Sequence, residues 1–285
     1  AVGVKAILDQ TGGEIRVYGT PAEETKGAKI PMSEAGLFDD VDAALMAHPY
    51  YRYERSGKSL AMDAIQFEFF GKAAHAAANP SAGINALDAV IQLFNSINAL
   101  RQQLEDHVRI HGIIVNGGQA ANIIPDYACA QFYVRSATRP HTDMVVEKVM
   151  NCAKGAALQT GCTWKASNYE YSYDELITNE RLSQTFTDNL VQLGVRPDEI
   201  HTADDHGSVD LGNVSRRCPA IHPYVKVIDE VHLLHTKEFR ALAMTERAFD
   251  GMILGAKALA ATACDLLLDA GLLKAVKEEF KQATA

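Results

Sequence analysis

Two adjacent glutamates, Glu23 and Glu24, directly follow the strand-like run EIRVYGT in this 285-residue sequence. Such a pair can serve a hydrolytic metal site, because one carboxylate binds the metal while its neighbour takes a proton from the metal-bound water. The same stretch also fits a helix start, with Thr20 as N-cap, Pro21 at the first helical position and Glu23 as the capping-box acid. Taken alone, the stretch favours capping and leaves the metal site open.

Two histidines could complete a metal site with Glu24. His48 ends the strand-like run DAALMAHPY, and His235 lies in LLHTKEF. Zinc binds imidazole nitrogen and carboxylate oxygen in a roughly tetrahedral shell, so the three residues are candidate ligands if they meet at one edge of a sheet. Each histidine taken singly is more often structural or exposed, and distance along the sequence does not decide whether the three meet.

The order of predicted elements indicates an α/β protein with an inserted α+β domain. Residues 1–62 alternate between helical and strand-like segments, as in a sheet whose site lies at the carboxyl ends of its strands. Residues 63–173 follow the order β-α-β-β-α-β and predict a ferredoxin-like domain. Residues 174–285 are expected to return to the first sheet and to end in a long apolar helix and a charged tail helix.

The composition is that of a globular protein, with 47% hydrophobic and 22% charged residues and a net charge of −9. No basic stripe is present, which argues against a nucleic-acid partner. The apolar stretches are expected to be too short to span a membrane. Five separated cysteines without a C-x-x-C pair are typical of reduced thiols and predict a cytoplasmic protein.

An ordered series of motifs carries a family resemblance. The series runs GTPAEE, MAHP, GKAAHAAANPSAGINALDA, NGGQAANIIP, FYVR, GNVS, AIHPY and LLHTKEF. It resembles the zinc amidohydrolase and dipeptidase superfamily, which includes aminoacylase, carboxypeptidase G, the aminobenzoyl-glutamate hydrolases and the β-alanyl-lysine-type dipeptidases. The resemblance covers nearly the whole chain and implies a zinc-peptidase-type catalytic domain formed by residues 1–62 and 174–285, with residues 63–173 as a lid and dimerisation domain.

The resemblance implies a role for each candidate residue at the metal. Glu23 matches the family's general base, and Glu24 the ligand that follows it. His48 and His235 match further ligands of one or two zinc ions. Manganese or cobalt could replace zinc in such a mixed nitrogen and oxygen site.

The resemblance also implies residues that contact the substrate. His75 matches a lid histidine that reaches the partner subunit's site and stabilises the developing oxyanion, and Asn122 and Arg135 match residues that hold the substrate's carboxylate end. Asp210 and His222 could line the substrate pocket, although Asp210 could equally cap the short helical turn that follows it. A basic substrate side chain could meet one of three acidic residues, Asp204, Asp205 or Asp210.

The implied function is a metal-dependent amidohydrolase or dipeptidase. Its substrate would be a dipeptide or an N-acyl amino acid with a free carboxylate, and it would act as a homodimer through the lid. The family pattern also has an upstream C-G-H-[DN] segment, which this sequence lacks. We therefore expect an N-terminally truncated sheet and a chain that by itself binds metal poorly and hydrolyses little. The alternative is a non-catalytic or fragment form that acts as a ligand-binding or dimerising module.

Overall fold

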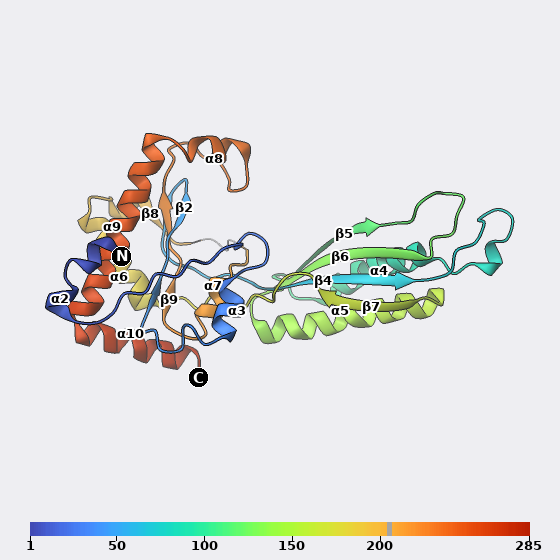
Figure 1. The fold of residues 1–285 in the computed structure, drawn as a ribbon, viewed down its shortest axis with the longest axis horizontal. Helices are drawn as coiled ribbons and strands as arrows, with labels where there is room; N and C mark the ends of the chain where they lie inside the picture. Colours follow the sequence, from blue (N-terminus) through green and yellow to red (C-terminus); the bar gives the residue numbers. More distant parts are fainter. Residues whose placement is uncertain (204–206) are drawn as a thin grey trace. The chain divides into compact units, whose positions relative to one another are not determined.

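The computed structural model describes residues 1–203 and 207–285. The chain forms two compact units (Figure 1). The first unit comprises Ala1–Glu23, Ala28–Ser59 and Leu176–Ala285, and the second comprises Glu24–Gly27 and Leu60–Glu175. The compact second unit therefore includes a short turn from the region predicted as catalytic, and the three predicted functional ranges stay predictions.

The second unit is a four-stranded antiparallel sheet with two helices packed on it. Its elements are, in chain order, β4 (Ala61–Phe70), η1 (Pro80–Ala82), α4 (Ala86–Leu100), η2 (Arg101–Gln103), β5 (Arg109–Asn116), β6 (Tyr127–Ser136), α5 (Arg139–Thr160) and β7 (Thr163–Asn168). The sheet order is β5-β6-β4-β7, which is the order of a split β-α-β fold. The predicted ferredoxin-like domain is confirmed.

Alternation of side chains along β4 and β6 builds the core of this unit. Phe67 and Phe69 are fully buried in β4, and the Phe67 ring contacts the ring of Phe132 in β6 edge-on at 6.0 Å. Because strand side chains alternate between faces, these aromatic residues point to the same side, where α4 and α5 cover them. The Asn85 side chain caps the start of α4, and Gly161 ends α5 in a left-handed conformation with φ 76°.

Strand β5 forms one edge of this sheet. Its side chains Ile113 and Val115 are 64% and 51% exposed. Gly112 faces the Phe132 ring so closely that a Cβ atom would lie 2.4 Å from it, so only glycine fits there. An exposed edge strand with apolar side chains is a template on which another chain can add a strand.

A carboxylate inside the second unit makes its stability depend on pH. Glu68 accepts a hydrogen bond from Tyr127 at 2.9 Å and pairs with Lys165 at 3.0 Å, and the Lys165 ammonium holds the pKa of Glu68 below its usual value. A carboxylate with a lowered pKa stabilises the fold above its unfolded pKa, and that contribution is lost as the pH falls through the folded pKa. The stabilisation by Glu68 is therefore fully present at neutral pH, begins to fall near pH 4.5 and is lost as the pH drops through the lower pKa of the folded state.

We expect Glu68→Gln to lower the free energy of unfolding by about 1.5–3 kcal/mol at neutral pH, because hydrogen bonds to charged groups contribute about that much. The difference from the unmodified chain should shrink toward zero in acid, where Glu68 is itself protonated. Denaturant titrations followed by the fluorescence of Trp164, the single tryptophan, would measure both values. Glu147→Gln on the exposed side of α5 is the matched control, and a difference independent of pH would contradict the prediction.

The first unit contains two small sheets. One pairs β1 (Ala44–Leu45) with β9 (Ala220–Ile221), and the other has the order β2-β10-β3-β8. Its strands are β2 (His48–Tyr50), β10 (Tyr224–Lys226), β3 (Tyr53–Glu54) and β8 (Ile200–His201). The helices of this unit are α1 (Val2–Lys5), α2 (Leu8–Thr11), α3 (Lys29–Glu34), α6 (Glu180–Gln192), η3 (Pro197–Glu199), α7 (Leu211–Val214), α8 (Lys237–Leu242), α9 (Glu246–Leu268) and α10 (Ala270–Ala283).

Helix α9 is the longest helix described in the first unit and packs beside α6 and α10. Its length and composition are those of a membrane span, so the expectation that the apolar stretches are too short was wrong for this helix. Helix α9 buries Ala258 and Leu266 in the apolar core of the unit, although only 28% of its apolar window is buried. Gly251 lies against β10, where a Cβ atom would come within 2.5 Å of the Lys226 carbonyl oxygen.

The segment that carries the two glutamates differs from both local predictions. The run EIRVYGT forms no strand, and the first helix after it, α3, begins at Lys29 and not near Thr20. The capping-box interpretation of Thr20 and Glu23 is therefore wrong. The run pairs with no strand among the described residues. Its residues Ile15 and Val17 line a cavity of about 670 Å³, which residues of β1 and α9 also line.

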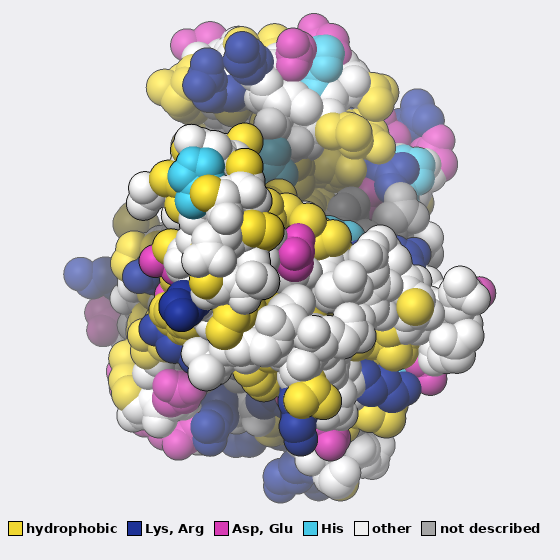
Figure 2. All heavy atoms as spheres, turned by 90° about the vertical axis from the view of Figure 1, so that its right-hand side faces the viewer, with side chains coloured by type: hydrophobic (Ala, Val, Ile, Leu, Met, Phe, Trp, Pro, Cys, Tyr) yellow, Lys and Arg dark blue, Asp and Glu magenta, His cyan; other side chains and the backbone are white. Residues whose placement is uncertain are grey.

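Charge is mixed on the surface that is turned toward the viewer in Figure 2. Lysine and arginine side chains alternate there with acidic ones, and apolar side chains lie among them. The sequence as a whole is acidic, with 36 acidic and 27 basic residues.

Candidate functional site

The parallel register of β2 and β10 places the aromatic side chains of the first unit together. His48 lies opposite Tyr224, and the His48 backbone N–H donates to the Pro223 carbonyl oxygen at 2.9 Å. The His48 ring stacks on His222 with 5.5 Å between centroids, and the His222 and Tyr224 rings meet at 5.2 Å. Two predicted site residues, His48 and His222, are therefore neighbours.

The loops around this cluster fix its backbone. The His222 backbone N–H donates to the Ser56 hydroxyl oxygen at 2.9 Å, and that hydroxyl in turn contacts the Thr178 hydroxyl at 2.6 Å. His222 itself is only 3% exposed. The His222 backbone is thus held by a hydroxyl group that is itself hydrogen-bonded.

Electrostatic effects connect Glu23 with the same cluster. Burial raises the pKa of Tyr224, and the negative charges of Glu54 and Glu23 raise it further. Burial likewise raises the pKa of Tyr50 to about 12. Both hydroxyl groups therefore stay protonated at neutral pH and can donate hydrogen bonds. Glu23, which is half-buried, lies close enough to Tyr224 for its charge to act there.

Backbone strain marks two of the candidate positions. Among the described residues, the non-glycine residues with positive φ are Ala22, at 61°, and His235, at 63°. A side chain in the left-handed region costs about 1–3 kcal/mol, and such residues cluster at functional sites. One of these two residues immediately precedes Glu23, and the other is a predicted metal ligand. The strain therefore supports a functional role for both loops.

Asp210 is engaged in a buried ion pair. Its carboxylate contacts the Lys29 ammonium at 2.7 Å and accepts the Lys29 backbone N–H at 3.3 Å, and the residue is 1% exposed. Asp210 makes no side-chain capping bond to α7, so the alternative in which it caps that helix is wrong. Its contact with substrate stays a prediction. The other two acidic candidates, Asp204 and Asp205, lie outside the described residues.

In the second unit the structure brings His75 and Asn122 together. The backbone N–H of Ala76 donates to the Asn122 carbonyl oxygen at 3.0 Å. The His75 Nδ1 atom accepts from the N–H groups of Ala77 and Ala78 at 3.3 and 3.2 Å. Because Nδ1 is the acceptor, the proton of the neutral ring resides on Nε2, which can donate to an oxyanion.

Arg135 lies at the other end of the same sheet. It pairs with Met62 at the start of β4, and a rise of about 3.4 Å per residue places it about 27 Å along β6 from Tyr127, which follows the Asn122 loop. Its guanidinium lies 5.2 Å from the centroid of the Tyr133 ring. Its Nε atom is buried without a hydrogen-bond partner among the described residues, so this N–H can still donate to the oxygen of a ligand.

The candidate metal ligands suit zinc in type, since zinc binds imidazole nitrogen and carboxylate oxygen. The His48 Nδ1 atom lies 2.9 Å from the Pro49 carbonyl oxygen, and because that oxygen is an acceptor, the neutral ring carries its proton on Nδ1 and its lone pair on Nε2. However, the residues that the structure describes contain no group of three or more His, Cys, Asp or Glu side chains positioned to hold a metal ion. Glu24 belongs to the second unit and His48 and His235 to the first, so their common metal site stays a prediction.

We expect this chain alone to retain well below one zinc ion after zinc loading and desalting, because the described residues hold no group of three donors. Elemental analysis would measure zinc per chain, and Glu24→Ala should leave the small value unchanged. Glu34→Ala, an exposed glutamate in α3, is the control. Near-stoichiometric zinc that falls only in Glu24→Ala would show that a site forms after all.

Comparison with known proteins identifies the class of protein. Residues 62–160 match the peptidase dimerisation domain of the M20 peptidases. The chain is 30% identical to one of the subunits of the p-aminobenzoyl-glutamate hydrolase of Escherichia coli (strain K12), over 100% of this chain and 71% of the relative. The chain therefore belongs to the M20 peptidase family, and the superfamily expected from the motif series is confirmed.

Two relatives are more similar in sequence. The chain is 37% identical to the Xaa-Arg dipeptidase of Mus musculus, over 99% of this chain and 66% of the relative. It is 35% identical to the Xaa-Arg dipeptidase of Homo sapiens, over 94% of this chain and 62% of the relative. The chain thus spans slightly less than two thirds of the length of both dipeptidases.

Solved structures confirm the fold class. An aminobenzoyl-glutamate utilization protein from Klebsiella pneumoniae superposes with a TM-score of 0.68 at 20% identity, covering 93% of this chain and 66% of that chain. The YXEP protein of Bacillus subtilis, described as a dinuclear metal binding peptidase from the M20 family, superposes with a TM-score of 0.64 at 19% identity, covering 94% of this chain and 70% of that chain.

Proposed function

We propose that the protein carrying this chain is a metal-dependent amidohydrolase or dipeptidase that hydrolyses the amide bond of a dipeptide or N-acyl amino acid with a free carboxylate. The observation that carries the proposal is the match of the whole chain to proteins named for such cleavages, an aminobenzoyl-glutamate hydrolase and an Xaa-Arg dipeptidase. Each name describes a substrate that ends in an amino acid with its own carboxylate.

In this proposal Glu23 moves the protons. As a carboxylate it takes a proton from the attacking water and then delivers it to the leaving amine. The His75 Nε2–H donates to the negative charge that develops on the carbonyl oxygen. One or two zinc ions, with manganese or cobalt as alternatives, would be held by Glu24, His48 and His235 and would supply Lewis-acid chemistry.

Substrate recognition is assigned to the remaining candidates. The Arg135 guanidinium would bind the substrate carboxylate through parallel hydrogen bonds, and Asn122, His222 and Asp210 would line the pocket. Because Arg135 lies far along β6 from the loops of His75 and Asn122, one lid does not bring the three together. We therefore assign His75 and Asn122 to the site of a partner copy in a homodimer formed through the lid, with Arg135 serving its own chain.

The cellular location and the partners of the enzyme are proposed from its thiols and its charge. All five cysteines are free, and burial raises the pKa of Cys218 to about 12, so this thiol stays protonated. Reduced buried thiols and an acidic balance support a cytoplasmic enzyme without a nucleic-acid or membrane partner. A second candidate function, a ligand-binding or dimerising module without catalysis, is favoured by the lack of a metal shell among the described residues.

The test compares dipeptides with their carboxyl-terminal amides. We expect the metal-loaded whole protein to hydrolyse Xaa-Arg, β-alanyl-lysine or aminobenzoyl-glutamate substrates with a kcat/KM about 10- to 150-fold above that for the amides, the value of a charge-assisted hydrogen bond. Arg135→Met should remove this preference.

The control for Arg135→Met is Arg109→Met, because Arg109 lies opposite Arg135 on the exposed strand β5. Hydrolysis that does not distinguish acids from amides would contradict the role of Arg135. No hydrolysis of any of the three substrates by the metal-loaded whole protein would favour the binding module.

A further inference from the structure

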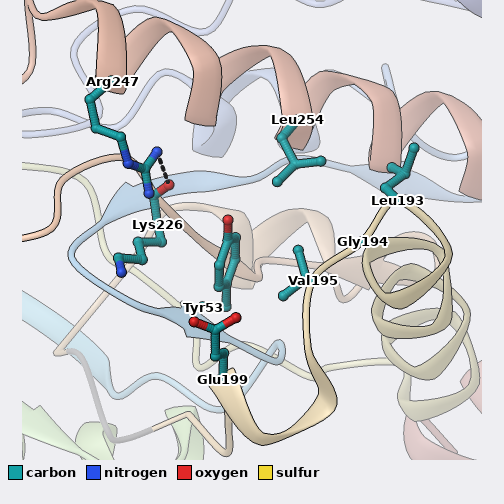
Figure 3. A pocket seen from close by; sticks show the side chains of 8 residues that line it. All are labelled: Tyr53, Leu193, Gly194, Val195, Glu199, Lys226, Arg247 and Leu254. Atoms are coloured by element: carbon teal, nitrogen blue, oxygen red, sulfur yellow. Dashed lines mark hydrogen bonds between the residues drawn. The ribbon is translucent and has the colours of Figure 1, made fainter.

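A second cavity opens in the first unit away from the candidate residues. It has a volume of about 190 Å³ and lies between β3, β10, η3 and α9 (Figure 3). None of the residues proposed for catalysis, metal or substrate lines it. Tyr53 rises from its floor, with the hydroxyl group directed between Arg247 and Leu254. Burial raises the pKa of Tyr53, so the hydroxyl remains a hydrogen-bond donor.

Charged groups of both signs border the cavity. Lys226 and Arg247 are cations that share the carboxylate of Asp229, with contacts of 3.1 Å each. The Arg247 Nη1 atom also donates to the Lys226 carbonyl oxygen at 3.5 Å, which orients the guanidinium beside the cavity. Glu199 stands below the Tyr53 ring, and its negative charge also acts on Arg196, whose pKa it helps to raise.

The opposite wall of the cavity is apolar. Leu193, Val195 and Leu254 project their side chains on the side away from Lys226 and Arg247. Two positive charges, on Lys226 and Arg247, thus stand beside two negative charges, on Asp229 and Glu199. A lone anion or a lone cation would leave one of these charges without a partner, whereas a ligand with both charges would match them.

We propose that this cavity binds a free α-amino acid with an aliphatic side chain. The ligand carboxylate lies against Arg247 and Lys226, its ammonium contacts Glu199, and its side chain packs on Leu193 and Leu254. The volume is below the roughly 300–1,000 Å³ of pockets for drug-sized ligands, which suits a ligand of this size. The site does not depend on the proposed hydrolase activity.

The test titrates the chain calorimetrically with L-leucine and with two analogues that each lack one charge. Isopentylamine lacks the carboxylate, and 4-methylpentanoate lacks the ammonium. We expect both analogues to bind at least about tenfold more weakly than leucine, because each leaves a charged wall unpaired. Glu199→Gln should weaken leucine binding about tenfold and leave 4-methylpentanoate unaffected, and Lys226→Met should weaken leucine and 4-methylpentanoate but not isopentylamine.

His48→Ala locates the binding, because it alters the candidate catalytic cluster and not this cavity. Leucine binding that survives His48→Ala and falls in Glu199→Gln supports the proposal. Leucine binding that is lost in His48→Ala and kept in Glu199→Gln would overturn it, as would equal binding of leucine and its analogues or no binding of leucine up to its solubility limit. Circular dichroism checks that each variant is folded. If Lys226→Met does not fold, the near-isosteric Glu199→Gln still tests the proposal.

Discussion

Glu23→Gln is expected to lower kcat/KM for dipeptide hydrolysis by about 10²- to 10⁴-fold, the usual contribution of a positioned general base. The amide has the shape of the carboxylate but cannot take a proton from water. Glu23 is half-buried and follows the strained Ala22, so its position is set by the backbone and the variant should keep it. Steady-state kinetics on the metal-loaded whole protein would measure the loss, together with metal content by elemental analysis.

The metal content decides what a loss of activity means. A loss with unchanged metal content assigns Glu23 to proton transfer, whereas a parallel loss of metal would assign it to the metal shell. Glu34→Gln in α3 is the matched control, since this exposed glutamate lies on the same segment of the chain. Activity of Glu23→Gln equal to that of the control would refute the role of Glu23.

Lys29→Met is expected to lower the free energy of unfolding by about 3–5 kcal/mol, because it leaves the Asp210 carboxylate buried without its cation. Lys29 and Asp210 are both buried, and their contact of 2.7 Å joins the first turn of α3 to α7. Urea denaturation followed by circular dichroism would measure the loss. Lys26→Met is the control, because this lysine is exposed and lies in the same segment.

The double variant Lys29→Met with Asp210→Leu separates a lost attraction from a stranded charge. Replacing a buried ion pair by apolar residues of similar volume is often neutral or stabilising. We therefore expect the double variant to recover most of the stability lost in Lys29→Met. A double variant as unstable as the single one would show that the loss comes from packing and not from the unpaired carboxylate.

The second unit was predictable because its signals are local. Alternating apolar residues in β4 and β6 and the helical spacing in α4 are properties of neighbouring positions, and the structure has these elements where the patterns indicate them. The run EIRVYGT carries the same kind of pattern but forms no strand. A strand needs a neighbour to pair its backbone, and propensity alone does not supply one.

Several features of the candidate site, in contrast, have no local signal in the sequence. Lys29 and Asp210 are 181 positions apart in the sequence, and no local pattern links them. Tyr224 was also missed, although it stands two residues after His222, and the strand period of two could have placed both on one face. The left-handed backbone at Ala22 and His235 carries no sequence signal, because glycine is the residue that usually marks it.

The exposed edge of β5 has a consequence for how substitutions act. Two copies that joined their β5 strands in antiparallel fashion would be related by a two-fold axis, so that the same patch serves both partners. Every substitution at Ile113 or Val115 would then occur twice in the interface, once from each partner. A charge introduced near the axis would lie close to the identical charge of the other copy. Symmetry would thus double the effect of each substitution on the free energy of assembly, whether the effect is stabilising or destabilising. A substitution in the core would instead change the stability of each chain once.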